Sequence, residues 1–500
     1  MEKKDYTVAI DLGSSNVTVA VGEKNADGLL DVVCLLSTPV EGVKAGKIEN
    51  IELVSNAIRT VIDQAEERLG IRIVEAYAGI SGDFVRCARY TDYVFVSDPQ
   101  NGVNQSSVDT LFERMRNVQA PDDETIMERI PQNYLVDDNQ EVTNPVGSFG
   151  RKLSSTFNFV LCLNTPMQRL DMALKRLGIK MLGAIADSLA TPEAVLSPDE
   201  KEEGVAVVDL GGGVTDVTIY YRNVVRYVVS IPMGASAINR DIRTMCIPEK
   251  HIERLKQKYG SAVSSLAPKD KLIRVNGRTV REAKDILLCN LAKVIEARAT
   301  DIADFVVDEI RDSGYTGKLA FGVVLTGGSA KLKDIDELFR RVLGLDVRIG
   351  LPDVGVSEAT KAMIADPTYA TVVGILHKGF ALGGMNSVIV ERPPVVEAPV
   401  EQRAATATPT TNTVAAEPRR GFQPPQPQPI PEFRHVPPRG ATAVAEAPER
   451  TTAASTPDEL EEDLETEMGE TKPKRGWGSL FKKTFEQINK GFSAADDEEI

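Results

Sequence analysis

Two short polar turns hold the residues of this chain that are best suited to chemistry. The first reads AIDLGSSNVTVAV and the second VVDLGGGVTDVTIY. In each, an apolar strand ends in an aspartate, Asp11 or Asp209, and Leu-Gly, two small residues and a second strand follow. Because the two stretches repeat 198 residues apart, they predict two similar lobes that face each other.

Both turns have the composition of a phosphate site. Small residues let backbone N–H groups approach phosphate oxygens closely, and hydroxyl and amide side chains add donors. Two aspartates from opposite lobes predict a Mg²⁺ held through water, since magnesium keeps several waters. Two ordinary glycine-rich hairpins are the alternative, and their repetition in register favours the phosphate site. The predicted ligand-binding residues are Asp11, Gly13, Ser14, Ser15 and Asn16 of the first turn, and Asp209, Gly211, Gly212, Gly213 and Thr215 of the second.

A third glycine turn lies further along the chain. The segment FGVVLTGGSAKL predicts a buried strand, then Gly327, Gly328 and Ser329, and then a helix. These glycines let the base and sugar of a nucleotide lie against the backbone. A strand–helix turn without a ligand is the alternative, and the two phosphate turns upstream favour the nucleotide.

Alternating strands and helices are expected to position the three turns. Two strands, Tyr6–Ile10 and Val17–Val21, flank the first turn, a strand covers 71–80, and 205–221 forms the second strand–turn–strand. Helices are predicted over 52–69, on both sides of a strand in 167–196, and through most of 249–310. In 249–310 the residues at core spacing are Ile286, Leu287, Leu291, Val294 and Ile295. This pattern predicts an α/β protein with two lobes.

The segment 84–165 differs from its surroundings. It contains several β-rich stretches around one helical stretch near 107–119. We interpret it as an inserted α+β subdomain.

Bulk composition narrows the class of protein. With 500 residues the chain is too long for one hydrophobic core, and its net charge of −15 argues against general nucleic-acid binding. Five scattered cysteines and three histidines indicate neither a disulfide framework nor a zinc site, which fits a reducing compartment. The N-terminus lacks the apolar core of a secretory signal, and no run of about 18 apolar residues occurs. We therefore expect a cytoplasmic protein.

The C-terminal part has a different composition. Residues 393–457 contain 14 of the 28 prolines, which predicts a disordered tether, and the acidic run DELEEDLETEMGE follows. In 471–492 basic residues surround an apolar helical stripe, which predicts an interfacial helix on anionic lipids. A helix docked on the protein's own core or in a partner's groove is the alternative. The predicted lipid-facing residues are Trp477, Leu480, Phe481, Phe485, Ile488 and Phe492, with Lys482 and Lys483 at the headgroups.

The three turns, in their order, resemble a known set of motifs. They are similar to the phosphate-1, phosphate-2 and adenosine motifs of the superfamily of actin, the heat-shock ATPase chaperones and the sugar kinases. The segment IERLKQKYG at 252–260 also resembles the adenosine-contacting helix of the bacterial actins. The resemblance implies that Glu253 and Lys256 reach the ribose or base of ATP; a solvated helical face is the alternative.

A narrower resemblance rests on three further segments. GISG (79–82), IPQNYLVDD (130–138) and NPVGSFGRKL (144–153), followed by the DLGGG turn, look like the FtsA family of bacterial division proteins, over about 1–388. The resemblance implies an actin-like ATPase fold with these parts: 1–83 with 166–203, the insertion 84–165, 204–240 with 318–388, a helical subdomain 241–317, a disordered linker 389–471, and an amphipathic helix 472–492.

The FtsA resemblance also implies a function. Such a protein binds ATP and Mg²⁺, polymerises at the inner membrane, binds the C-terminal peptide of FtsZ on 241–317, and recruits later division proteins through the insertion. One departure concerns catalysis, because ADSLATPEAVL places Asp187-Ser188 where relatives carry a Glu or Gln that positions water. We therefore expect a weak ATPase at most, with no catalytic residue assigned. A pilus-assembly scaffold of the same fold, a small-molecule kinase and a chaperone are the alternatives.

Overall fold

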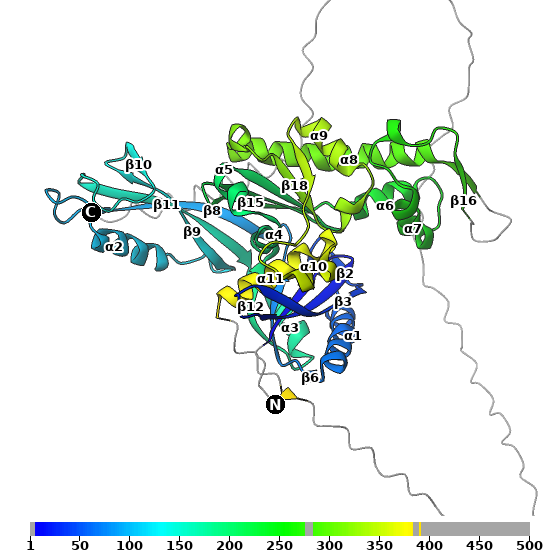
Figure 1. Cartoon of the computed structure of the whole chain (residues 1–500), viewed down its shortest axis with the longest axis horizontal. Coiled ribbons are helices and arrows are strands. Elements are labelled where there is room, and N and C mark those ends of the chain that lie inside the picture. The colour runs from blue at the N-terminus through cyan, green and yellow to red at the C-terminus, as the bar shows by residue number, and fades with distance from the viewer. Residues whose placement is uncertain (1–5, 276–283, 384–389, 392–500) are drawn as a thin grey trace, which may run out of the picture. The chain divides into compact units, whose positions relative to one another are not determined.

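The computed structural model describes residues 6–275, 284–383 and 390–391, all within one compact unit, residues 1–400 (Figure 1). The predicted amphipathic helix 472–492, and nearly all of the predicted linker 389–471, lie outside the described residues.

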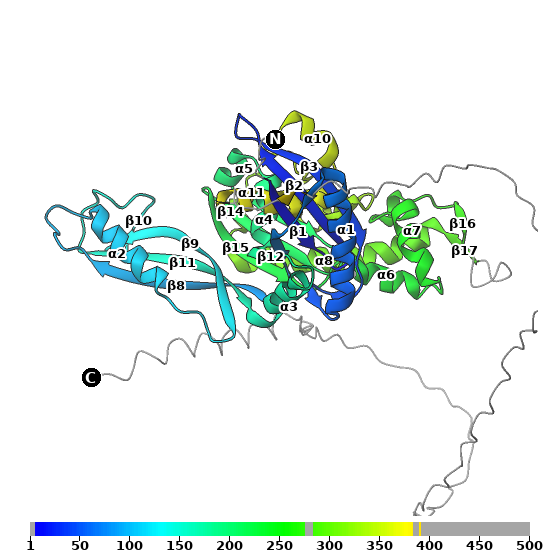
Figure 2. The same ribbon diagram turned by 90° about the horizontal axis from the view of Figure 1, so that it is seen from below.

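The first lobe is built on a five-stranded sheet in the order β12-β7-β1-β2-β3. Its strands are β1 (Thr7–Leu12), β2 (Asn16–Lys24), β3 (Leu30–Pro39), β7 (Glu75–Ile80) and β12 (Lys180–Ala186). Its helices are α1 (Ile51–Leu69), α3 (Asn164–Lys175), α4 (Asp187–Val195), α10 (Glu358–Ile364) and α11 (Ala370–Ala381). Helix α1 packs against β2 and β3 (Figure 2).

Helix α1 shows how local sequence sets an element. The Asn50 side chain caps its first turn by accepting from the N–H groups of Glu52 and Leu53, and Gly70 ends it in the left-handed region at φ 66°. Its buried residues are Val54, Ser55, Ile58, Val61, Ile62 and Ala65. The predicted helix over 52–69 is confirmed, with its first residue at Ile51.

The second lobe repeats the plan with the strand order β15-β14-β13-β18-β19. Its strands are β13 (Val205–Leu210), β14 (Thr215–Tyr221), β15 (Val224–Ile231), β18 (Val323–Thr326) and β19 (Val347–Ile349). Its helices are α5 (Pro198–Glu203), α6 (Ala235–Arg243), α7 (Glu249–Tyr259), α8 (Leu288–Ser313) and α9 (Ile335–Leu343).

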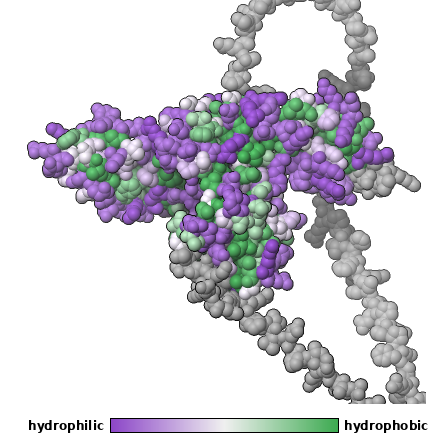
Figure 3. Space-filling model, in the orientation of Figure 1, coloured by the Kyte–Doolittle hydropathy of each residue, from purple (hydrophilic) through white to green (hydrophobic). Residues whose placement is uncertain are grey.

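Strand β13 is buried on both faces and joins two hydrophobic cores. Val205 and Val207 belong to the core that fills the first lobe, whereas Ala206 and Val208 belong to the core under α6 and α8. Successive side chains of a strand point to opposite faces, so this continuous apolar run serves both cores. Outside the cores, hydrophilic residues predominate on the face seen in Figure 3.

The insertion is an α+β subdomain with a four-stranded antiparallel sheet in the order β10-β9-β11-β8. Its elements are β8 (Val85–Phe95), α2 (Gln105–Arg116), β9 (Glu124–Val136), β10 (Gln140–Val142) and β11 (Lys152–Leu163). Helix α2 packs against β8 and β11 (Figure 2).

Short elements complete the described part. They are β4 (Val43–Lys44), β5 (Lys47–Ile48), β6 (Ile71–Arg72), β16 (Leu272–Val275), β17 (Lys284–Leu287), β20 (Val390–Glu391), and the 3₁₀ helices η1 (Ser264–Leu266), η3 (Thr316–Lys318), η4 (Gly328–Lys331) and η5 (Pro367–Tyr369).

Several predicted bounds were wrong. Ile286 and Leu287 lie in strand β17, which pairs with β16, and helix α8 begins only at Leu288. The strand over 71–80 is divided into β6 and β7, and the helix near 107–119 is Gln105–Arg116, capped by Asn104. A 3₁₀ helix, η4, precedes the helix predicted after the third turn.

Candidate functional site

The first predicted turn joins β1 to β2. The Gly13 N–H donates to the Asn16 carbonyl at 3.0 Å, and Asp11 lies one residue before the end of β1. Ser14 Oγ accepts from the Gly46 N–H at 3.1 Å. The turn is therefore held in a defined conformation by the loop between β4 and β5.

The second turn joins β13 to β14 with the same geometry. The Gly211 N–H donates to the carbonyl three residues later at 3.0 Å, as the glycine of the first turn does. The strands also pair in the same register, so Asp209 lies opposite Asp216 where Asp11 lies opposite Thr18. The repeat predicted from the sequence is confirmed as a repeated hairpin.

The two turns lie against each other. A Cβ added at Gly212 would stand 2.2 Å from Ser15 Oγ, and one added at Gly213 would stand 2.5 Å from Ser14 Oγ. A side chain at either glycine would require the facing serine hydroxyl to move. The structure therefore brings together the phosphate turns predicted from the sequence.

The third turn packs on the second. Gly327 has φ 84°, and an added Cβ there would lie 2.2 Å from Asp209 Oδ1. Ser329 Oγ donates to the Gly211 carbonyl at 3.0 Å, and Gly328 begins η4. Only glycine suits the Gly327 position, because it needs both a left-handed backbone and the absence of a side chain.

Asp209 is fixed by two hydroxyls. It is 8% exposed, and its Oδ2 accepts from Thr191 Oγ1 at 2.9 Å and from Thr371 Oγ1 at 2.8 Å. Burial raises its pKa, although both hydrogen bonds act in the opposite direction. These threonines come from α4 and α11, so helices of the first lobe orient an aspartate of the second.

Asp216 is a second buried carboxylate near the turns. Its Oδ2 accepts from Ser81 Oγ at 2.6 Å, and its Oδ1 accepts from Ser230 Oγ. Burial, and then the charge of Asp209, raise the pKa of Asp216 to about 7. Burial and the charges of Asp209 and Asp216 likewise raise the pKa of Asp11 to about 7.

Asp187 is the fourth member of what we call the aspartate cluster: Asp11, Asp187, Asp209 and Asp216. It begins helix α4 and is 6% exposed, and burial and the other three charges raise its pKa well above the usual range. A Cβ added at Gly79 would lie 2.3 Å from Asp187 Oδ1. That oxygen and Ser188 Oγ are buried and have no hydrogen-bond partner in the described part of the chain.

The aspartate cluster brings four carboxylates near the turns without forming a direct metal site. Carboxylate oxygens are the ligands that Mg²⁺ prefers; burial first, and then the charges of the neighbouring carboxylates, raise the pKa of Asp11 and of Asp187. The unpartnered Asp187 Oδ1 supplies a free acceptor. Within 6–275 and 284–383, no three such side chains stand close enough together to bind a metal directly.

Two family models match the chain. The model described as "Cell division protein FtsA" matches residues 206–374, and the one described as "SHS2 domain inserted in FTSA" matches residues 82–161. The chain is 32% identical to Cell division protein FtsA of Pseudomonas aeruginosa over 373 residues, which are 74% of this chain and 88% of that protein. This chain belongs to the FtsA family.

Other relatives and solved structures agree with this placement. The FtsA proteins of Escherichia coli K12 and Bacillus subtilis are 31% and 30% identical, over 75% of this chain and 90% and 84% of their own lengths. The structure of a PilM-PilN type IV pilus biogenesis complex aligns with a TM-score of 0.51 at 13% identity, covering 75% of this chain and 98% of that one, which shows a shared fold alone. The predicted α/β, actin-like fold with an inserted subdomain is confirmed.

In this FtsA-family protein the two residues predicted to reach the ribose or base of ATP, Glu253 and Lys256, bind each other. Glu253 and Lys256 are ion-paired at 2.9 Å on α7, and Glu253 also accepts from Asn239 at 2.6 Å. Although burial opposes it, the charge of Lys256 and these hydrogen bonds lower the pKa of Glu253. Helix α6, which carries Asn239, begins at the second turn, where the Ser236 N–H donates to the Gly212 carbonyl at 2.7 Å.

Sequence reasoning missed part of the site. Asp216 ends the motif DLGGGVTD and is the counterpart of Thr18 in the repeat, so a signal was present in the motif itself. Ser81 lies in GISG, which had served only as a family marker. Thr191 and Thr371 stand 18 and 162 residues from Asp209, and no local pattern singles them out.

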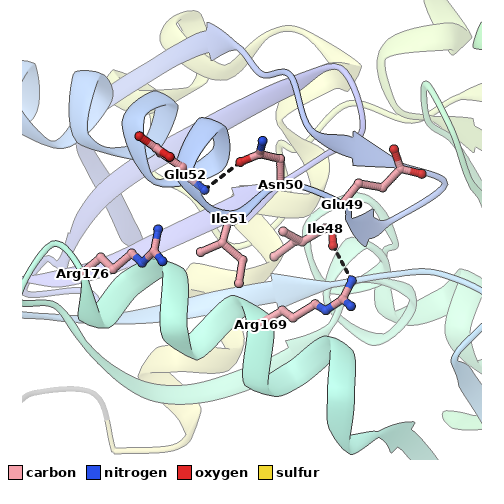
Figure 4. Close-up of a pocket in the computed structure, with 7 residues that line it drawn as sticks. All are labelled: Ile48, Glu49, Asn50, Ile51, Glu52, Arg169 and Arg176. Atoms are coloured by element: carbon pink, nitrogen blue, oxygen red, sulfur yellow. Dashed lines mark hydrogen bonds between the residues drawn. The ribbon is translucent and has the colours of Figure 1, made fainter. Parts of the chain in front are cut away.

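A surface hollow of about 330 Å³ lies apart from the predicted residues (Figure 4). Its lining comprises Ile48, Glu49, Asn50, Ile51, Glu52, Arg169 and Arg176. Arg169 donates to the Ile48 carbonyl at 2.8 Å, and the Asn50 side chain caps α1. The hollow contains none of the predicted site residues.

The predicted lipid-facing residues, Trp477 to Phe492, lie outside the described residues. Among the helices that the structure describes, none combines the length and the apolar character needed to span a membrane.

Proposed function

We propose that this FtsA-family protein binds Mg·ATP between its two hairpin turns, polymerises at the cytoplasmic face of the inner membrane and tethers FtsZ filaments there. The observation that carries the nucleotide proposal is the contact of two repeated turns, each with an aspartate at its strand end. Membership of a cell-division family supports the cellular role.

Each turn has a part in nucleotide binding under this proposal. Backbone N–H groups and hydroxyls of 13–16 and 211–215 would bind the phosphates, and Asp11 and Asp209 would hold Mg²⁺ through its waters. When bound, the cation neutralises phosphate charge. Gly327 to Ser329 would let the sugar and base lie against the backbone, with Glu253 and Lys256 beside them.

We propose that hydrolysis is slow. The segment ADSLATPEAVL places Asp187-Ser188 in the region where relatives carry a Glu or Gln that positions the attacking water. Steady-state phosphate release should therefore fall well below roughly 1 s⁻¹, the lower end of typical enzyme turnover.

The partners follow from the family. The C-terminal peptide of FtsZ would bind on 241–317, later division proteins would bind the inserted subdomain, and residues 472–492 would attach to anionic lipids. The stripe of aromatic and aliphatic residues with lysines around it supports the lipid proposal. Replacing Phe481 by Glu should release the full chain from anionic liposomes in co-sedimentation, while ATP-analogue binding stays unchanged. A variant that still pellets with lipid would make the tail a partner-binding segment.

The nucleotide proposal is tested by Asp209→Ala. Because Asp209 would share Mg²⁺ with Asp11 and lies against the third turn, its loss should weaken binding of a fluorescent ATP analogue by at least about 100-fold, as for a lost charge-assisted contact. Asp346→Ala, away from the turns, is the matched control. Unchanged affinity in a folded Asp209→Ala variant would remove the argument from the paired turns.

A further inference from the structure

The inserted subdomain is attached to the second lobe through β15, the edge strand of the second sheet (Figure 1). The Asn158 Nδ2 of β11 donates to the Arg226 carbonyl at 3.1 Å, and the Gln132 Nε2 of β9 donates to the Val225 carbonyl at 3.0 Å. Side chains of the subdomain therefore bind two backbone carbonyls of the edge strand.

Arg226 is the centre of this attachment. It is 3% exposed, and its guanidinium donates to the Tyr221 carbonyl at 3.0 Å and to the side-chain oxygens of Gln132 and Asn133, both at 3.1 Å. A buried guanidinium with neutral acceptors depends on every one of these bonds, since an unpaired buried charge is costly. Arg226 stays buried only while the subdomain supplies the oxygens of Gln132 and Asn133.

The same strand reaches the aspartate cluster. Ser230 lies four residues beyond Arg226 on β15, past an irregularity in the pairing of β14 with β15 at Arg226. The Ser230 hydroxyl donates to Asp216. Strand β15 thus connects the subdomain's attachment to a carboxylate beside the phosphate turns.

A second connection runs through the point where the chain enters the subdomain. Ser81 lies four residues before β8, which begins at Val85, and its hydroxyl donates to the other oxygen of Asp216 at 2.6 Å. The Ser81 backbone also leaves no room for a side chain at Gly46, whose N–H binds Ser14 of the first turn. Asp216 is therefore bonded both to the entry of the subdomain and to the strand on which it docks.

We infer that Asp216 couples the occupancy of the aspartate cluster to the docking of the inserted subdomain on β15. This inference rests on the proposed nucleotide site. A Mg·nucleotide changes the charge beside Asp216, and the serine hydroxyls on both sides must reorient with the carboxylate. A rearrangement of Asp216 and its serines therefore alters the hydrogen bonds of Arg226. The docking of the subdomain then depends on whether nucleotide is bound, and a partner of the subdomain would detect the difference.

Such a coupling is reciprocal. If nucleotide binding shifts the docking, then weakening the docking must shift nucleotide affinity by the same factor, which is typically about 5- to 150-fold. The residues of the attachment lie outside the turns, so an effect on affinity cannot come from lost ligand contacts.

The experiment uses the full chain and a non-hydrolysable ATP analogue with Mg²⁺. Hydrogen–deuterium exchange of 124–136 and 224–231 is measured with and without the analogue, and the dissociation constant is measured for wild type and Arg226→Met. We expect the analogue to change exchange in both segments, and Arg226→Met to change the affinity at least five-fold. Arg222→Met, an exposed arginine in the β14–β15 turn, is the matched control and should leave the affinity unchanged.

Two further variants keep the test decisive. Gln132→Ala removes one acceptor of Arg226 from a half-buried site and replaces Arg226→Met if that variant does not fold. In Ser81→Ala, which lacks one of the two hydroxyls bound to Asp216, the analogue should change the exchange of both segments less than it does in wild type. If wild type binds the analogue and exchange of both segments is unchanged, the coupling is wrong while the nucleotide site stands. If wild type binds no nucleotide, the proposed function is wrong and the coupling is overturned with it.

Discussion

The two hairpin turns share a backbone but differ in what surrounds their aspartates. Asp209 is 8% exposed and bonded to two threonine hydroxyls, whereas Asp11 is half-buried and has its pKa raised to about 7 by burial and by neighbouring carboxylates. Hydroxyl donors fix Asp209 in one orientation, whereas the pKa of Asp11 is raised by burial first and then by the charges of Asp209 and Asp216. The second turn is thus the rigid half of the site, and the first is the half that responds to charge.

The small residues of the two turns are also unequal. The first turn carries Ser14 and Ser15, and their hydroxyls occupy the space that Gly212 and Gly213 leave open in the second. The repeat is therefore complementary: side chains of one turn fit where the other has none. Two serine turns facing each other would clash, and two glycine turns facing each other would leave a gap.

The largest effect is expected where the rigid half is most crowded. In Gly327→Ala the new Cβ would meet Asp209 Oδ1 and the Leu210 backbone at 2.2 and 2.8 Å, in a backbone conformation that alanine resists. We expect a loss of about 1–3 kcal/mol in stability, seen as a Tm lower by several degrees, and at least ten-fold weaker nucleotide binding.

Gly317→Ala is the control for this change, because an added Cβ there has nothing within 4 Å. It should keep the wild-type Tm and affinity. Equal behaviour of the two alanine variants would contradict the view that the third turn is wedged against Asp209.

A smaller effect should follow from exchanging side chains between the turns. Gly212→Ala places a Cβ 2.2 Å from Ser15 Oγ, which can turn aside at some expense to the phosphate site. We expect roughly five-fold weaker binding of the ATP analogue, and recovery to within about two-fold in the double variant with Ser15→Gly. If the double variant instead binds the analogue more weakly than either single variant, the two turns do not depend on each other's shape.

The sequence predicts the local parts of this molecule well and its long-range partners poorly. The hairpins, helix α1 and the repeat follow from periodicity and glycine placement, which act within about 20 residues. Ser81 and Asp216 are in contact although 135 residues separate them in the sequence, and no pattern near either residue predicts this contact. Ile286 and Leu287 have helical spacing, but pairing of β16 with β17 places them in a strand. Tertiary pairing thus overrides local pattern at such sites.

The smallest effect concerns the residue that distinguishes the two hairpins. Asp216 lies opposite Asp209 where the first hairpin has Thr18, so Asp216→Thr makes the second hairpin resemble the first. Burial first, and then neighbouring carboxylate charges, raise the pKa of Asp216 and of Asp11 to about 7, above the ordinary 3.8. Between about pH 4 and 7 the folded state then binds more protons than the unfolded state, so these groups make stability fall as pH rises through that window.

The Asp216→Thr variant should flatten this dependence. It removes one buried carboxylate and one of the charges that raise the pKa of Asp11, so the decline in Tm from pH 5 to pH 8 should shrink. Thermal unfolding in a chelating buffer at pH 5 and pH 8 measures this decline in Tm, with Asp346→Thr as a control outside the cluster. If the variant lost Tm with pH as steeply as wild type, burial and neighbouring charge would not raise the pKa of Asp216 in the folded protein. The contrast between a hydroxyl-bound and a charge-governed aspartate would then have no physical basis.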